Sequence, residues 1–191
     1  FKYYKNNTAM KITHSLKFLF CTLFLSLIIS SASHAQAGWN PELEKDCNEA
    51  ISEMEKDAPK LETYFSKAYG YAIYPKITKA GLGIGGAGGK GLVYQGSTIT
   101  GESKLGQASL GLQAGGQQFS ELIFFEDKAA YERFTGGKFK FGAQASAVAI
   151  SEGGAAVAPY QDGVAIFTYV KGGLMYEASV GGQKFTFEPI K

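Results

Sequence analysis

Histidine and cysteine are nearly absent from this chain, which has two of each among its 191 residues. Both histidines, His14 and His34, and one cysteine, Cys21, lie before residue 36. From residue 36 onward, Cys47 is the only residue of either type. This part of the chain therefore excludes an intramolecular disulfide, a Ser-His or Cys-His nucleophile and a histidine-ligated metal site.

Three side chains remain as candidates for reactivity. Cys47 lies on the apolar face of an expected helix, so we interpret it as a small buried hydrophobe, with an intermolecular disulfide as the alternative. Glu121 and Glu177 have apolar neighbours and could serve as acid and base. On a strand, Glu121 would share a buried face with Phe119 and Ile123, which favours a structural, hydrogen-bonded carboxylate. We expect no enzymatic activity and no cofactor.

The first 35 residues have the pattern of a secretory signal peptide. Lys11 and Lys17 lie before an apolar run, Phe18–Ile29. This run is shorter than the roughly 20 residues of a membrane-spanning helix. Small residues then predict cleavage after Ala35. We interpret residues 1–9 as an extension upstream of the start at Met10, residues 10–35 as the signal and 36–191 as one domain. An exported protein of the periplasm, or one peripheral to the outer membrane or cell envelope, is expected.

Charge does not favour a nucleic-acid partner. Four of the 19 basic residues and none of the 17 acidic ones precede residue 36, so 15 basic and 17 acidic residues remain. A protein that binds nucleic acid would show a basic stripe and a basic excess. The sequence therefore predicts no nucleic-acid binding.

Glycine dominates the second part of the chain, because 24 of the 25 glycines fall between Gly70 and Gly182. Glycine allows backbones to pass closely and to turn sharply. The pattern predicts an α+β fold in which N-terminal amphipathic helices pack on a glycine-rich, strongly curved antiparallel β-sheet or small barrel with one inserted short helix. The expected helices are 41–57, 61–69 and 128–134, with Asn40 as the N-cap of the first and Asp127 as the N-cap of the last. The expected strands are Tyr71–Tyr74, Gly81–Ala87, Gly91–Gln95, Ser109–Gln113, Phe119–Phe125, Phe139–Ile150, Val164–Val170, Leu174–Val180 and Lys184–Phe187.

The glycine-rich segment Gly81–Gly91 contains G-x-G-x-x-G three times. A dinucleotide site requires a strand before this motif and a helix after it, so that phosphate meets a helix N-terminus. Here a strand-like segment, Gly91–Gln95, follows instead. The matches reflect the abundance of glycine and do not indicate nucleotide binding.

Lysines and aromatic residues alternate in two places. The first cluster contains Tyr71, Tyr74, Lys76, Lys79 and Lys90. The second cluster contains Lys138 and Lys140 together with Arg133, Phe139 and Phe141. Such residues can bind anionic lipid headgroups while the aromatic rings enter the membrane interface. An ordinary solvated face is the alternative.

The ordered blocks Tyr71–Gly86, Gly89–Val93, Ala108–Gln117 and Glu121–Phe125 resemble the SYLF family, also called the Ysc84 or DUF500 actin- and lipid-binding domain. The resemblance covers about Pro41 to Pro189 and is closest to the secreted bacterial branch. It implies a non-enzymatic domain that binds anionic phospholipids, phosphoinositides among them. Eukaryotic members act with actin, which is not expected as a partner of an exported protein.

Two other functions stay open at the level of the sequence. Glycine-rich alternating strands are also typical of integral outer-membrane β-barrels, and a structural protein of the envelope would need no ligand. The sequence specifies neither the lipid nor the oligomeric state. Reversing the charge of Lys76 and Lys79 is expected to weaken binding to anionic liposomes if these lysines hold the headgroup.

Overall fold

The computed structural model describes residues 40–111, 116–137, 139–151, 157–170 and 180–190. The chain divides into two units, Phe1–Gln36 and Ala37–Lys191, and the described residues all belong to the second. Three predicted features therefore lie outside the described residues: the signal peptide, Lys138 and Glu177. The expected strand Leu174–Val180 also lies outside them, except for its last residue. In the described part of the chain, no helix has the length and hydrophobicity of a membrane-spanning segment.

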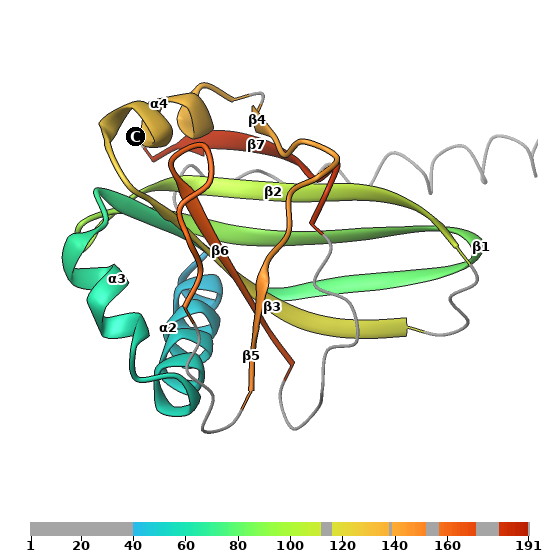
Figure 1. Ribbon diagram of the computed structural model, residues 1–191, viewed down its shortest axis with the longest axis horizontal. Helices are drawn as coiled ribbons and strands as arrows, with labels where there is room; N and C mark the ends of the chain where they lie inside the picture. Colours follow the sequence, from blue (N-terminus) through green and yellow to red (C-terminus); the bar gives the residue numbers. More distant parts are fainter. Residues whose placement is uncertain (1–39, 112–115, 138, 152–156, 171–179, 191) are drawn as a thin grey trace, which may run out of the picture. The chain divides into compact units, whose positions relative to one another are not determined.

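The described elements confirm the predicted α+β class, with two helices first, then strands, and a short helix inserted between strands (Figure 1). Their order is α2 (Pro41–Asp57), α3 (Leu61–Lys67), β1 (Gly70–Gln95), β2 (Thr98–Gly111), β3 (Gly116–Phe125), α4 (Lys128–Thr135), β4 (Phe139–Lys140), β5 (Val148–Ile150), β6 (Val164–Tyr169) and β7 (Lys184–Pro189).

Helix α2 begins where the sequence predicts it to begin. The Asn40 side chain accepts a hydrogen bond from the Glu42 backbone N–H at 3.0 Å, and Pro41 occupies the first helical position. Cys47, Ala50 and Met54 form the buried face. Burial raises the pKa of the Cys47 thiol to about 12. The interpretation as a buried hydrophobe is confirmed, and the burial argues against the alternative of an intermolecular disulfide.

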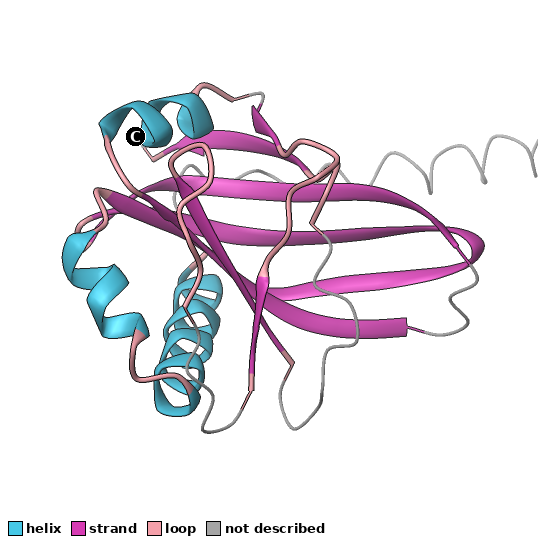
Figure 2. Cartoon of the chain, in the orientation of Figure 1, coloured by secondary structure: helices cyan, strands magenta, loops and turns pink. Residues whose placement is uncertain are grey.

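The seven strands of the described residues form one sheet in the order β4-β7-β2-β1-β3-β6-β5. Figure 2 shows these strands as a single, strongly twisted sheet with helices on both sides. Every pairing is antiparallel except that of β5 with β6, which is parallel. The prediction of an antiparallel sheet is therefore correct for all but its last pair.

Strand β1 doubles back on itself, with its first half paired to β3 and its second half to β2 (Figure 1). A Cβ atom on Gly89 would lie 2.8 Å from the Lys76 carbonyl oxygen, and one on Gly85 would lie 2.6 Å from the Ala80 carbonyl oxygen. Glycine is therefore required where the two halves meet. The sequence predicted three separate strands here, whereas the structure has one element, β1, that turns back on itself and contains a bulge between Tyr74 and Ile77.

The sheet buries a core on each face. We call the first the helix-side core, where α2 and α3 pack on residues such as Ile73, Leu122 and Phe167. We call the second the α4-side core, where α4 packs on residues such as Ile123 and Phe185. Strands β1, β3 and β6 contribute alternate residues to the two cores, as strand geometry requires.

Two predicted strand boundaries were wrong. Strand β2 extends back to Thr98, because its polar first half is held between β1 and β7 by backbone pairing that its side chains do not reveal. The expected strand Phe139–Ile150 is instead two short strands, β4 and β5, with residues 141–147 between them largely irregular. This irregular segment forms part of a cavity.

Candidate ligand-binding cavity

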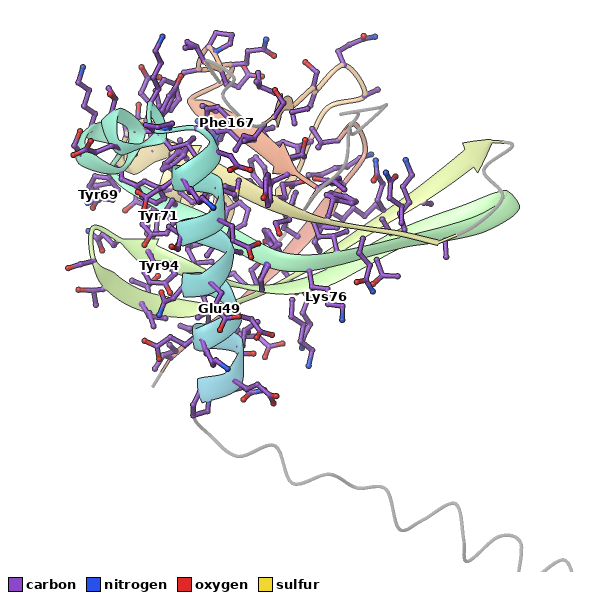
Figure 3. All side chains as sticks on the ribbon, turned by 90° about the horizontal axis from the view of Figure 1, so that it is seen from below. Glu49, Tyr69, Tyr71, Lys76, Tyr94 and Phe167 are labelled. Carbon is purple, nitrogen blue, oxygen red and sulfur yellow. The ribbon has the colours of Figure 1, made fainter. Side chains whose placement is uncertain are left out.

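The two tyrosines of the first predicted lysine–aromatic cluster are buried to different degrees. Tyr74 is fully buried, and its hydroxyl shares a 2.6 Å hydrogen bond with Ser103. Tyr71 is half-buried and stacks on Tyr94 with ring centroids 4.6 Å apart beside the helices (Figure 3). Burial raises the pKa of Tyr71 to about 12. The structure therefore removes Tyr74 from the predicted binding surface and leaves Tyr71 only partly accessible.

The lysines of this cluster have unlike surroundings. Lys76 lines a hollow of about 450 Å³ together with Asp46, Glu49 and Glu53 of α2, and Figure 3 shows it beside Glu49. Three carboxylates near one lysine make this hollow unfavourable for an anion. Lys79 pairs with Gln117 across the strands.

Lys90 lies in a third environment, opposite Lys104 on β2. Lys104 in turn forms an ion pair with Glu188 at 2.7 Å. The carboxylate of Glu188 offsets part of the positive charge at this position. The three lysines of the first cluster therefore have different neighbours, and their role in binding lipid stays a prediction.

The second predicted cluster lines a cavity of about 510 Å³, which we call the α4 cavity. Arg133 of α4 and Lys140 of β4 are both part of its lining. The other lining residues come from β4 to β6 and the segments between them: Phe139, Phe141, Gly142, Gln144, Ala145, Ser146, Val148, Ala158, Pro159, Gln161, Asp162, Val164 and Ile166. The structure thus brings together residues that are separated by up to about thirty positions in the sequence.

Helix α4 positions Arg133. Asp127 caps the helix by accepting a 2.8 Å hydrogen bond from the Ala130 backbone N–H, as predicted. Ala130 and Phe134, four residues apart, face the α4-side core, which leaves Arg133 at the edge of the cavity. The Arg133 guanidinium donates to the Asp162 carbonyl oxygen. Because a guanidinium has five N–H donors, Arg133 retains donors for an anion.

A tight turn presents the carbonyl that Arg133 binds. Asp162 and Gly163 have φ angles of 51° and 76°, and Gln161 and Val164 on either side exchange backbone hydrogen bonds. This is the geometry of a two-residue hairpin, for which Asp-Gly is a favoured sequence. The turn fixes one wall of the α4 cavity.

Lys140 has a second lysine next to it. In the pairing of β4 with β7, Phe139 lies opposite Phe185 and Lys140 lies opposite Lys184. Both lysines are exposed, and neither takes part in an ion pair within the described residues. Like charges directly opposite each other on a sheet repel, so an anion between them would be stabilising.

The opposite wall of the cavity is held by α3. The Tyr64 hydroxyl donates to the Ala158 carbonyl oxygen at 2.7 Å and accepts from the Ala158 backbone N–H at 3.0 Å. Val157, just before this point, is 58% exposed and is the one large exposed hydrophobic residue among those described. An exposed apolar side chain therefore lies next in sequence to the cavity wall.

Residues 106–189 match the family model named Ysc84 and described as a Las17-binding protein actin regulator. This part of the chain is similar to the Ysc84, or SYLF, family. A similar protein, Beta cell expansion factor A of Aeromonas veronii, is 29% identical over 157 residues, which cover 76% of this chain and 59% of that relative. The chain therefore spans about three fifths of the length of this relative.

The match to the Ysc84 model bears on the position of the site. All residues that line the α4 cavity fall within the matched range 106–189, whereas Tyr71, Lys76 and Lys90 precede it. The α4 cavity is thus part of the region by which the family is identified. Of the predicted residues, it contains Lys140, while Lys138 lies outside the described residues.

A second polar feature of this chain is fully buried. Glu121, Thr168 and Tyr74 lie opposite one another on β3, β6 and β1, and Gln183 donates to Glu121 Oε2 at 2.9 Å. Burial raises the pKa of Glu121 to about 8, against the opposing effect of the Gln183 bond. The predicted buried, hydrogen-bonded role of Glu121 is confirmed. Among the described residues, no group of Asp, Glu, Cys or His side chains is arranged to hold a metal ion.

Sequence reasoning missed three features of the cavity. Lys184 belongs to a strand that pairs with β4 only after folding, and nothing local links it to Lys140. Tyr64 contacts a residue 94 positions later. Asp162-Gly163 could have been recognised, because this dipeptide is a typical hairpin signal before the alternating run that follows it.

Proposed function

We propose that this chain is a non-enzymatic lipid-binding protein of the bacterial periplasm or cell envelope, which binds anionic phospholipid headgroups at the α4 cavity. The observation that carries the proposal is that Arg133 and Lys140 line a cavity whose buried residues are apolar, while Lys184 lies opposite Lys140 on the neighbouring strand. The predicted export signal at 10–35 and the Ysc84 family support the location and the non-catalytic role.

The arrangement suits a membrane surface. Each lysine or arginine near an anionic leaflet contributes about 1 kcal/mol. Val157, exposed beside the cavity wall, is available to enter the headgroup region. The description of the family as an actin regulator applies to Ysc84 proteins, and the partner we propose for this exported chain is lipid.

Charge reversal tests the position of the site. The double variant Lys140→Glu, Lys184→Glu is expected to lower the affinity for vesicles of phosphatidylcholine with phosphatidylglycerol by at least about tenfold, because two cations are lost and two anions gained. Co-sedimentation at two salt concentrations measures this, and the difference should shrink at high salt.

Lys76→Glu, Lys79→Glu is the matched control, because it makes the same change in charge at the first cluster. We expect it to bind nearly as the unmodified protein does. If instead the first-cluster variant loses binding and the Lys140, Lys184 variant keeps it, the headgroup site lies at the first cluster and the proposal for the α4 cavity fails.

A further inference from the structure

We infer that the α4 cavity holds the apolar chain of a single lipid molecule, and not only its headgroup. This inference rests on the proposed function and names the ligand more closely: a single-chain anionic amphiphile, or one chain of a membrane phospholipid. A domain of this kind would take a lipid partly out of the bilayer, whereas a headgroup site would bind only to the bilayer surface.

Polar and apolar groups are separated by depth in the cavity. Its buried lining residues are all apolar, with exposed fractions of 3% for Phe141, 5% for Ala158, 6% for Val164 and 5% for Ile166. Its charged and polar side chains are all exposed, at the rim. These rim residues are Arg133, Lys140, Gln144, Ser146, Gln161 and Asp162.

A headgroup alone does not match this separation. An inositol phosphate or glycerophosphate is polar throughout, so it would satisfy Arg133 and Lys140 and leave the apolar floor in contact with water. An apolar chain against Phe141 and Ile166 removes that floor from water, which is the favourable step of hydrophobic binding. The chemistry of the lining therefore fits an anionic group attached to a hydrocarbon.

The size of the cavity fits one chain. Its volume of about 510 Å³ lies within the roughly 300–1,000 Å³ of small-molecule sites. Val157, which precedes Ala158 of the cavity wall, is 58% exposed, so an apolar side chain next in sequence to the cavity is available to a lipid chain.

Titration calorimetry with soluble ligands tests the inference. Lysophosphatidylglycerol below its critical micelle concentration should bind much more tightly than glycerol 1-phosphate, which has the charge without the chain. Affinity should rise about fourfold for each added methylene until the cavity is full, which is the usual gain for a buried CH₂. Equal affinity for the two ligands would overturn the inference.

Ala145→Phe fills the cavity from a half-buried position, and Ala149→Phe is the matched control on the exposed side of β5. We expect Ala145→Phe to lower the affinity for lysophosphatidylglycerol at least tenfold, because the ring takes the place of the lipid chain. Ala149→Phe should leave this affinity unchanged. Equal binding of the lipid by both variants would contradict the inference.

A second variant covers the case in which Ala145→Phe disturbs folding, which circular dichroism would show. Ile166→Ala enlarges the floor, so the chain length of best binding should become longer, an effect that a purely structural role of Ile166 does not produce. An unchanged chain-length profile would count against the inference. Charge-dependent vesicle binding without any binding of the lysolipid defeats this inference alone, whereas absence of both defeats the proposed function as well.

Discussion

Glu121 is a carboxylate in a place where charge is costly. Its side chain is fully buried, and the group it bonds is the uncharged amide of Gln183. Its pKa of about 8 in the folded protein lies above the ordinary value of 4.5. The folded state therefore keeps a proton on Glu121 that the unfolded chain releases at lower pH. The stability from this proton is complete below about pH 4.5 and is lost as the pH rises through 8.

Replacement of Glu121 by Gln is expected to remove this pH dependence. In the unmodified protein, Glu121 should make the free energy of unfolding fall by up to about 1.4 kcal/mol for each pH unit between 5 and 8. The neutral amide does not titrate, so Glu121→Gln should show a flatter profile and be the more stable protein at pH 9. Urea unfolding from pH 5 to pH 9 measures both profiles. Parallel profiles would show that Glu121 does not titrate in this range.

Helix α3 is only seven residues long, yet it connects the helical layer to the α4 cavity. Tyr64 makes both of its hydroxyl hydrogen bonds to the backbone of Ala158, in the cavity wall. Its ring also packs on Phe124 and Phe167 of the sheet. The ring therefore fixes the helix on the sheet, while the hydroxyl fixes the wall to the helix.

Tyr64→Phe separates these two roles, because it keeps the ring and removes the hydroxyl. We expect a loss of about 1–3 kcal/mol in the free energy of unfolding, since a partly buried N–H and C=O lose their partner. Vesicle binding should also weaken severalfold because the cavity wall is released. Tyr169→Phe is the control, as it removes a 3.0 Å hydroxyl bond to Asp57 away from the cavity. Equal loss of binding in both variants would mean that Tyr64 acts only through stability.

Local signals predicted the elements that depend on local chemistry. The caps at Asn40 and Asp127 and the apolar face of α2 are visible in the sequence because they involve residues a few positions apart. The full length of β2 was not predicted, because its polar half is held by pairing with β1 and β7. Lys140 was predicted as a site residue because basic and aromatic residues surround it in the sequence. Lys184 was not predicted, because it comes next to Lys140 only through the pairing of β4 with β7.

At the scale of the whole sheet, glycine allows the two halves of β1 to lie against each other, so that one half pairs with β3 and the other with β2. The sequence predicted close backbone packing here from the abundance of glycine, and the contacts at Gly85 and Gly89 confirm it. Which glycines are required could not be predicted, because this depends on the distance between the two halves of β1. Some positions are crowded by backbone, whereas at others, such as Gly106 on β2, an added Cβ would have no atom within 4 Å.

Two alanine substitutions test this difference. Gly89→Ala places its Cβ 2.8 Å from the Lys76 carbonyl oxygen and 3.0 Å from Ile77, so the two halves of β1 must separate. We expect it to destabilise the protein by about 1–3 kcal/mol, as overpacking of a core does. Gly106→Ala meets open space, and because alanine restricts the unfolded chain it should be neutral or stabilising by up to about 1 kcal/mol. Thermal and urea unfolding of both variants measure the effect. If Gly89→Ala is as stable as Gly106→Ala, close contact between the halves of β1 does not determine the curvature of the sheet, and the high glycine content needs another explanation.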